Sequence, residues 1–159
     1  MSKLDYVINL GGSIVNGGTL NAPFLQLFKE FIKAQITNGK SFGIIVGGGY
    51  VARLYQDFLR DHFPHQEADL DMVGIRATTL NAQLIWTVLK EWAYPEVLES
   101  PHQEAGEADA KVLIFSGWKP GWSTDYVSVL VAERFGVKEV LSLSNIKGVY
   151  ALKDGKVQE

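Results

Sequence analysis

Three glycine-rich segments of this chain each follow directly after a short apolar stretch. They are Gly11-Gly12-Ser13, Gly47-Gly48-Gly49 and the run from Gly117 to Asp125. Glycine brings backbone N–H groups close to an anion because it has no Cβ, and a helix that begins after the loop adds the positive end of its dipole. One such loop also serves as a plain tight turn. Three of them together predict a site that holds several phosphate groups.

The composition narrows the class of protein. The chain has 159 residues, 47% of them hydrophobic, which is enough for one compact domain with its own core. It contains no cysteine, so disulfides and thiolate metal sites are excluded, and His62, His65 and His102 lack ligand-like spacing. A net charge of −3 argues against broad nucleic-acid binding. The N-terminus has no long apolar run, so we expect a cytoplasmic protein without a membrane partner.

Apolar runs and helical periodicities alternate along the chain. Strands are expected at 5–10, 42–46, 111–115 and 139–143, helices at 21–38, 50–62, 70–92 and 123–135, and a hairpin at 149–157. The expected apolar stripe of the first helix is Phe24, Leu27, Phe28, Phe31 and Ile32. This order predicts an α/β fold with a largely parallel sheet between helices. Because ligands gather beyond the carboxyl ends of such strands, the three loops are expected to meet at one edge.

The second loop also fits another template. Gly47-x-Gly49-x-x-Ala52 after a strand matches the dinucleotide fingerprint, with Asp69 or Asp71 near the expected acidic position. The acid of that fingerprint ends the next strand, whereas these two aspartates begin a helical pattern. A dinucleotide site would also leave the first glycine loop unused, so the pattern disfavours an oxidoreductase.

Five motifs in this order resemble the amino-acid kinase superfamily and, within it, the uridylate (UMP) kinases of the archaeal-like type. The first glycine loop is similar to the family's first phosphate loop, and residues 47–53 are similar to its GGG-x-x-A-R loop. Residues 71–82 resemble the D-x-x-G-x-x-A-T-x-x-N-A helix, 120–125 the P-G-x-T-T-D loop and 145–150 the D-V-D-G-V-Y segment. The resemblance covers nearly the whole chain.

The resemblance implies a fold and a reaction. The fold is a three-layer α-β-α sandwich with a mainly parallel sheet, of the amino-acid kinase or carbamate kinase type, in a single domain over 1–159. Residues 1–115 form its acceptor-binding half, and 116–159 begin its ATP-binding half. The implied reaction transfers the γ-phosphoryl group of ATP, bound with Mg²⁺, to UMP in pyrimidine nucleotide biosynthesis. The implied partners are UMP, ATP and further copies of the chain.

The resemblance also implies roles for individual residues. Phosphoryl transfer depends on positioning and charge, so glycine amides, an arginine and a magnesium ion supply most of it. The implied catalytic residues are Gly11, Gly12 and Asp125; the UMP-binding residues are Gly48, Gly49, Arg53, Asp71 and Thr124; and the ATP-binding residues are Gly12, Ser13, Asn145 and Tyr150. No residue is assigned as a protein metal ligand.

Three features depart from the family pattern. Asn9 stands where many members have a lysine, and Lys119 or Lys147 is a candidate for the missing cation. Tyr150 is followed by the expected hairpin instead of a proline turn. Related chains continue beyond the position of Glu159, so we expect an incomplete ATP-binding half. Either the chain is a fragment of a longer kinase, or a partner chain closes the site, or the protein binds a nucleotide without efficient transfer.

Several alternatives stay open at the level of sequence. The chain could be a non-catalytic nucleotide or oxyanion module, or a kinase of the superfamily with another small acceptor. Arg53 could be a surface cation, Asp71 or Ser123 could cap a helix, and Trp118 and Trp122 could serve packing. The expected 70–92 helix, through Ile85, Trp86 and Leu89, could offer an oligomer interface or a core face.

Overall fold

A parallel sheet forms the centre of the molecule. The computed structural model describes residues 3–106, 109–145, 151–153 and 156–158. Four strands, β1 (Tyr6–Leu10), β2 (Phe42–Val46), β3 (Val112–Phe115) and β4 (Val140–Leu143), lie in the order β3-β2-β1-β4. All three neighbouring pairs are parallel, with Ile8 opposite Ile44 and Leu141. The α/β fold with a mainly parallel sheet is therefore confirmed.

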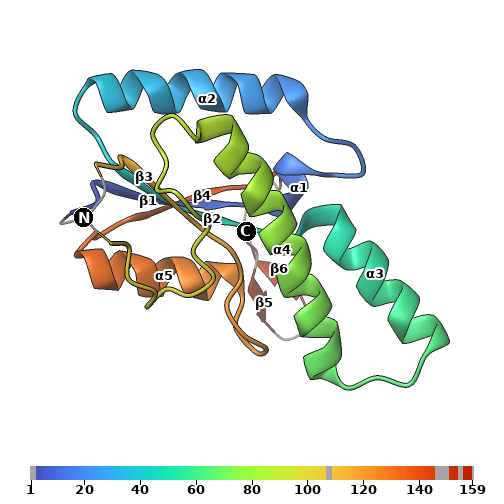
Figure 1. Ribbon diagram of the computed structural model, residues 1–159. Coiled ribbons are helices and arrows are strands. Elements are labelled where there is room, and N and C mark those ends of the chain that lie inside the picture. The colour runs from blue at the N-terminus through green and yellow to red at the C-terminus, as the bar shows by residue number, and fades with distance from the viewer. Residues whose placement is uncertain (1–2, 107–108, 146–150, 154–155, 159) are drawn as a thin grey trace.

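Helices cover both faces of this sheet (Figure 1). On one face lie α2 (Ala22–Thr37) and α4 (Glu67–Leu89), and on the other lies α5 (Thr124–Phe135). Strand residues alternate between the two faces, so Ile8 packs in the core under α2 and α4, while Val7 packs under α5. Two separate apolar cores result, and the three-layer arrangement follows from them.

Local sequence signals set most helix ends. The Asn21 side chain accepts a hydrogen bond from the Phe24 amide at the start of α2, and the Ser123 side chain accepts one from Tyr126 at the start of α5. Gly136 ends α5 in the left-handed conformation, with φ of 67°. These boundaries agree with the sequence-based expectations.

The long helix α4 differs from its expected bounds. It begins at Glu67 instead of Leu70 and ends at Leu89 instead of Trp92. Gln66 and Asp69 form a capping box, in which each side chain bonds to the other residue's backbone. The polar stretch before Leu70 therefore starts the helix, and Asp71 is not its cap.

Two smaller expectations also change. The buried side of α2 is made by Leu25, Phe28 and Ile32, while Leu27 and Phe31 are exposed, so the expected apolar stripe was partly wrong. A short helix, α1 (Gly12–Val15), follows the first glycine loop and was not expected. The expected hairpin is present as the antiparallel pair β5 (Ala151–Lys153) and β6 (Lys156–Gln158), and its first two residues lie outside the described residues.

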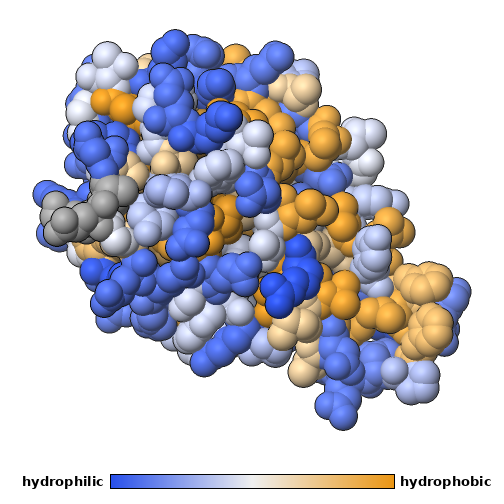
Figure 2. Space-filling view, in the orientation of Figure 1, coloured by the Kyte–Doolittle hydropathy of each residue, from blue (hydrophilic) through white to orange (hydrophobic). Residues whose placement is uncertain are grey.

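The remaining helix, α3 (Gly49–His62), packs mainly along α4 and away from the sheet (Figure 1). Ala52 is the only buried residue of α3, and hydrophobic residues gather on the side formed by α3 and α4 (Figure 2). By contrast, Ile85 and Leu89 of α4 lie in the sheet core, and the Trp86 indole donates to the Tyr94 carbonyl. The core-face alternative for these α4 residues is therefore the correct one.

Within the described residues, no helix combines the length and apolarity needed to cross a membrane.

Candidate functional site

The main cavity lies where the direction of strand order reverses. Strand β1 has β2 on one side and β4 on the other, and ligands of open parallel sheets bind at such a switch point. A cavity of about 540 Å³ opens there, beyond the carboxyl ends of the strands. Its walls come from all three glycine-rich segments: Gly11, Gly12, Ser13, Gly47, Gly48, Gly49, Thr124 and Asp125. The expected meeting of the three loops is confirmed.

The first two loops fit together backbone against backbone. A Cβ added to Gly12 would overlap the Gly49 amide nitrogen and lie 2.5 Å from the Gly47 carbonyl oxygen. A Cβ on Gly47 would lie 2.7 Å from the Gly12 amide nitrogen. Gly49 also has φ of 65°, a conformation that favours glycine. These glycines are therefore required for the close approach of two loops, beyond any role as simple turns.

One face of α4 ties the loops in place. The Asn81 amide donates to the carbonyl oxygens of Gly47 and Gly48, at 2.8 and 3.0 Å. The Gly117 amide donates to Thr78 Oγ1 at 2.7 Å. Because Asn81 and Thr78 are both buried and their partners are backbone atoms, these three hydrogen bonds hold the second and third loops against α4. The motif in 71–82 therefore positions the second and third glycine-rich loops.

Asp71 belongs to the same face of α4 but reaches the third loop. Its Oδ2 accepts a hydrogen bond of 2.7 Å from the Gly121 amide. It lines a second cavity of about 260 Å³, together with Gln56, Lys119 and Trp122. Gly48 and Thr124 line both cavities, so the two cavities are adjacent and share part of their walls. A molecule with an anionic end and a bulkier neutral end could occupy the two together.

Two charged side chains face the main cavity. Arg53, on the second turn of α3, is exposed and has no carboxylate within ion-pair distance among the described residues. Asp125 accepts a hydrogen bond of 2.6 Å from Asn9 Nδ2. Since a carboxylate only accepts, the Asn9 amide must direct its nitrogen toward Asp125. The other atom of that amide group, Asn9 Oδ1, is buried. In the described part of the chain it is the one buried side-chain oxygen or nitrogen without a hydrogen-bond partner.

The far side of the cavity is formed by the end of β4. Ser13 Oγ donates to Asn145 Oδ1 at 2.7 Å, so the first glycine loop contacts the segment after β4. Asn145 lines the cavity with Ser142 and Ser144. Tyr150, which the resemblance assigns to the same ligand as Asn145, lies outside the described residues.

Lys119 belongs to the third glycine-rich segment but lies away from the main cavity. Its ammonium is 4.0 Å from the ring centroid of Trp118 and 5.0 Å from that of Trp122. It lines the second cavity, and it is absent from the lining of the first. The suggestion that Lys119 replaces the lysine missing at Asn9 is therefore unsupported by its position, and Lys147 lies outside the described residues.

Most of the residues singled out from the sequence meet at this site, and some contacts were missed. The Asn9–Asp125 bond, the ties of Thr78 and Asn81, and the serines after β4 were not anticipated. Thr78 and Asn81 lie seven and ten residues after Asp71, which places the three on one face of a helix. That spacing was the sequence signal from which the contacts of Thr78 and Asn81 with the loops could have been predicted.

Comparison with known proteins agrees with the fold. A sequence model of the Amino acid kinase family matches residues 6–159. The chain therefore belongs to the Amino acid kinase family. Its parallel sheet between helices, with the glycine loops at the switch point, is consistent with this family.

Particular relatives are named uridylate kinases. The chain is 34% identical to that of Thermoplasma volcanium over 155 residues and 36% identical to that of Methanocorpusculum labreanum over 157 residues. Each match covers 96% of this chain and 66% of the relative, so the chain spans just under two thirds of their length. The solved uridylate kinase of Archaeoglobus fulgidus superposes with a TM-score of 0.78 at 28% identity, covering 94% of this chain and 67% of that one.

A more distant structure shares the fold. The UMP kinase of Ureaplasma parvum superposes with a TM-score of 0.69 at 19% identity, covering 94% of this chain and 72% of that one.

Proposed function

We propose that this chain carries the acceptor site of a UMP kinase, which transfers the γ-phosphoryl group of ATP to UMP and gives UDP. The observation that carries the proposal is the joint lining of one cavity by three glycine-rich loops and Arg53. The relatives named uridylate kinases support UMP as the acceptor.

The acceptor phosphate is assigned to Gly48, Gly49 and Arg53. The first turn of α3 carries the positive end of the helix dipole, and within it the Tyr50 amide already donates to the Asn16 carbonyl, so the phosphate is assigned to the glycine amides. The Arg53 guanidinium adds a full charge and a planar pair of donors for phosphate oxygens. An arginine without a carboxylate partner beside glycine amides is suited to a phosphate that arrives and leaves.

The nucleoside of UMP is assigned to the second cavity. Asp71 lines it and keeps one carboxylate oxygen, Oδ1, beyond the Oδ2 that accepts from Gly121. That oxygen is an acceptor for a ribose hydroxyl. Thr124, shared by both cavities, offers a hydroxyl donor between the phosphate and the nucleoside.

The donor phosphates are assigned to Gly11, Gly12 and Ser13, with Asn145 and Tyr150 on the nucleotide side. An oxygen of the UMP phosphate attacks the γ-phosphorus, a new P–O bond forms, and the bond to the bridging oxygen breaks as ADP leaves. The glycine amides and Arg53 spread the charge of the transferring group, and no protein nucleophile takes part.

Magnesium bound with ATP supplies additional positive charge to these phosphates. The site fits such a cation, because the Asp125 carboxylate lines the cavity and Asn9 Oδ1 is a buried oxygen without a partner. Among the described residues, no group of three or more His, Cys, Asp or Glu side chains could hold a metal by itself. Asp125, positioned by Asn9, is the residue that would hold the cation.

The test is the formation of UDP from Mg-ATP and UMP, read by chromatography of the nucleotides, with UMP binding measured separately by calorimetry. Arg53→Gln is expected to weaken UMP binding about 10-fold or more, since it removes a charged hydrogen-bond donor. Arg60→Gln is the matched control, because Arg60 lies two turns further along α3 and pairs with Asp57. UMP binding without UDP, even at high protein concentration, would leave a nucleotide-binding module and overturn the kinase.

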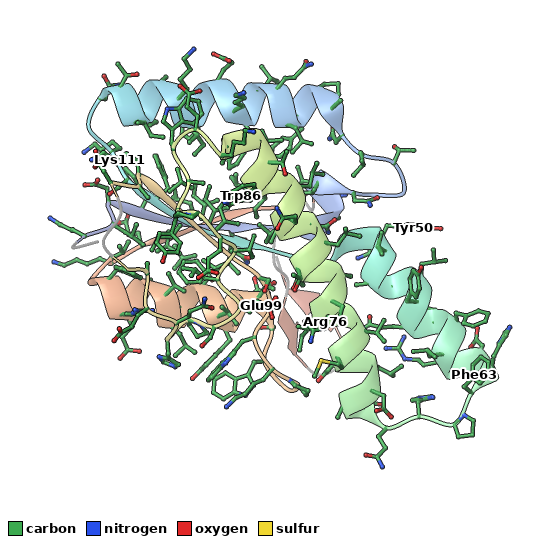
Figure 3. The ribbon with its side chains drawn as sticks, in the orientation of Figure 1. Tyr50, Phe63, Arg76, Trp86, Glu99 and Lys111 are labelled. Atoms are coloured by element: carbon green, nitrogen blue, oxygen red, sulfur yellow. The ribbon has the colours of Figure 1, made fainter. Side chains whose placement is uncertain are left out.

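We also propose that copies of the chain associate through α3 and α4. Tyr50, Leu54, Tyr55 and Phe58 of α3 expose between 40% and 58% of their surface. An apolar groove of about 280 Å³ lies alongside them, between Val51 and Tyr55 of α3 and Met72 and Leu80 of α4. Tyr50 and Phe63 extend this surface to both ends of α3 (Figure 3). A contiguous exposed apolar patch on a single side is typical of a protein interface.

A further inference from the structure

We infer that Lys119, held between Trp118 and Trp122, recognises the O4 carbonyl of the acceptor base and so selects uracil over cytosine. The inference rests on the proposed acceptor site and adds a specificity residue to it. It depends on three properties of Lys119: its cavity, its aromatic support and the absence of an ion pair with any carboxylate that the structure describes.

The cavity places Lys119 at the nucleoside end of the acceptor. Lys119 and Trp122 line the cavity that contains Asp71, whereas Arg53 lines the neighbouring anion cavity. With the phosphate at Arg53 and the ribose at Asp71, the base is the part of a nucleoside monophosphate that remains. Lys119 is therefore the cation available to the base, and Arg53 the cation available to the phosphate.

The two indoles restrict where the ammonium can lie. The ring centroids of Trp118 and Trp122 are 5.2 Å apart and their planes meet at 60°, with the Lys119 ammonium 4.0 and 5.0 Å from them. Cation–π attraction holds a lysine in such a position and leaves its N–H donors free for another acceptor. Trp122 is fixed in turn by Tyr126, whose ring centroid is 4.6 Å away, and Trp118 by His102 at 5.2 Å. A long and normally mobile side chain is thereby given a defined direction.

The lysine has no competing anion. Lys119 forms no ion pair with any carboxylate of the described residues, although Asp71 lines the same cavity. Asp71 is instead bonded to the Gly121 amide. An ammonium group has three donors and no acceptor, so it favours the carbonyl O4 of uracil and disfavours the amino group that replaces it in cytosine. The same site can therefore discriminate between two pyrimidines of nearly equal size.

The test compares UMP and CMP binding by calorimetry in wild-type protein and in Lys119→Met. We expect the variant to bind UMP about 10-fold more weakly, as for loss of a hydrogen bond to a charged group, with little change for CMP. Trp122→Leu, which removes one of the two rings, is expected to lower the UMP-to-CMP preference in the same direction. Lys40→Met is the matched control, since Lys40 lies 5.9 Å from the Tyr6 ring centroid at the opposite end of the sheet.

The outcomes separate this inference from the proposed function. Equal weakening of UMP and CMP by Lys119→Met would mean that the lysine contacts the phosphate or ribose, and it would overturn base selection while leaving the kinase intact. An unchanged UMP-to-CMP preference would overturn it as well. Failure of the wild-type protein to bind either nucleotide would overturn the acceptor site itself, and with it the inference.

Discussion

The side-chain amide of Asn9 donates a hydrogen bond of 2.6 Å to Asp125 Oδ1 and so joins the end of β1 to the first turn of α5. The two residues are 116 positions apart in the sequence. The bond fixes the direction of a carboxylate that is otherwise exposed at the edge of the main cavity. Asn9 carries no charge, so its contribution at this position is to orient Asp125 and to offer an oxygen.

Replacing Asn9 with leucine is expected to lower the turnover of UMP while leaving UMP affinity nearly unchanged. The variant keeps the branching at Cγ and removes the donor that orients Asp125. A hydrogen bond to a charged group is worth about 1.5–3 kcal/mol, so turnover should fall roughly 10-fold to 100-fold. Steady-state kinetics and calorimetric UMP binding check the two parts. Turnover within about 2-fold of wild type would contradict the assigned role of the Asn9–Asp125 pair.

Replacing Asn81 with alanine is expected to weaken both folding and UMP binding. The variant leaves the Gly47 and Gly48 carbonyl oxygens without their side-chain donor, in a place where the asparagine is 3% exposed. The expected loss in the free energy of unfolding is about 1–3 kcal/mol. Urea denaturation followed by circular dichroism measures it.

The control for this variant is Thr87→Ala on the same helix. Thr87 bonds only to the Gln83 carbonyl of its own helix, and it is exposed. We expect its loss to leave UMP affinity unchanged. If both variants weaken UMP binding equally, α4 would act through its overall stability, and the specific tie to the acceptor loop would be wrong.

The sequence predicted the fold better than it predicted the contacts of the site. Strand positions were correct because buried parallel strands are short apolar runs. The loop positions were correct because glycine residues mark the ends of those strands. The start of α4 was missed because Gln66 is an uncommon cap, recognisable only by its reciprocal bond with Asp69. The Asn9–Asp125 bond joins distant segments, and no local pattern encodes it. Lys119, one of the two candidates for the cation missing at Asn9, lines the second cavity and not the main one, and no local pattern shows this either.

The apolar surface of α3 is expected to hold two copies of the chain together. Leu54→Glu places a charge at the centre of that surface and should convert a dimer into a monomer, because an unpaired charge is costly to bury in an apolar contact. Sedimentation equilibrium measures the mass. Leu27→Glu is the matched control, since Leu27 is 73% exposed on α2, a helix separate from α3 (Figure 1). A monomeric wild-type protein, or equal effects of both variants, would refute the assigned interface.

The acid limit of stability is expected to depend on Asp5, at the end of the sheet opposite the site. Its Oδ2 accepts hydrogen bonds of 2.9 Å from both the hydroxyl and the amide of Ser41. The hydroxyl bond is the main cause that lowers the pKa of Asp5 below its ordinary value of 3.8. A lowered pKa in the folded state means that the contribution is present above 3.8 and is lost as the pH falls through the lower folded value. Asp5→Asn should therefore be less stable than wild type at neutral pH, and the difference should shrink below pH 3.8.

Urea denaturation at a series of pH values measures this difference in stability, with Glu30→Gln on the exposed side of α2 as the control. A difference that stays constant across the acid range would show that the Ser41 bonds do not depend on the charge of Asp5.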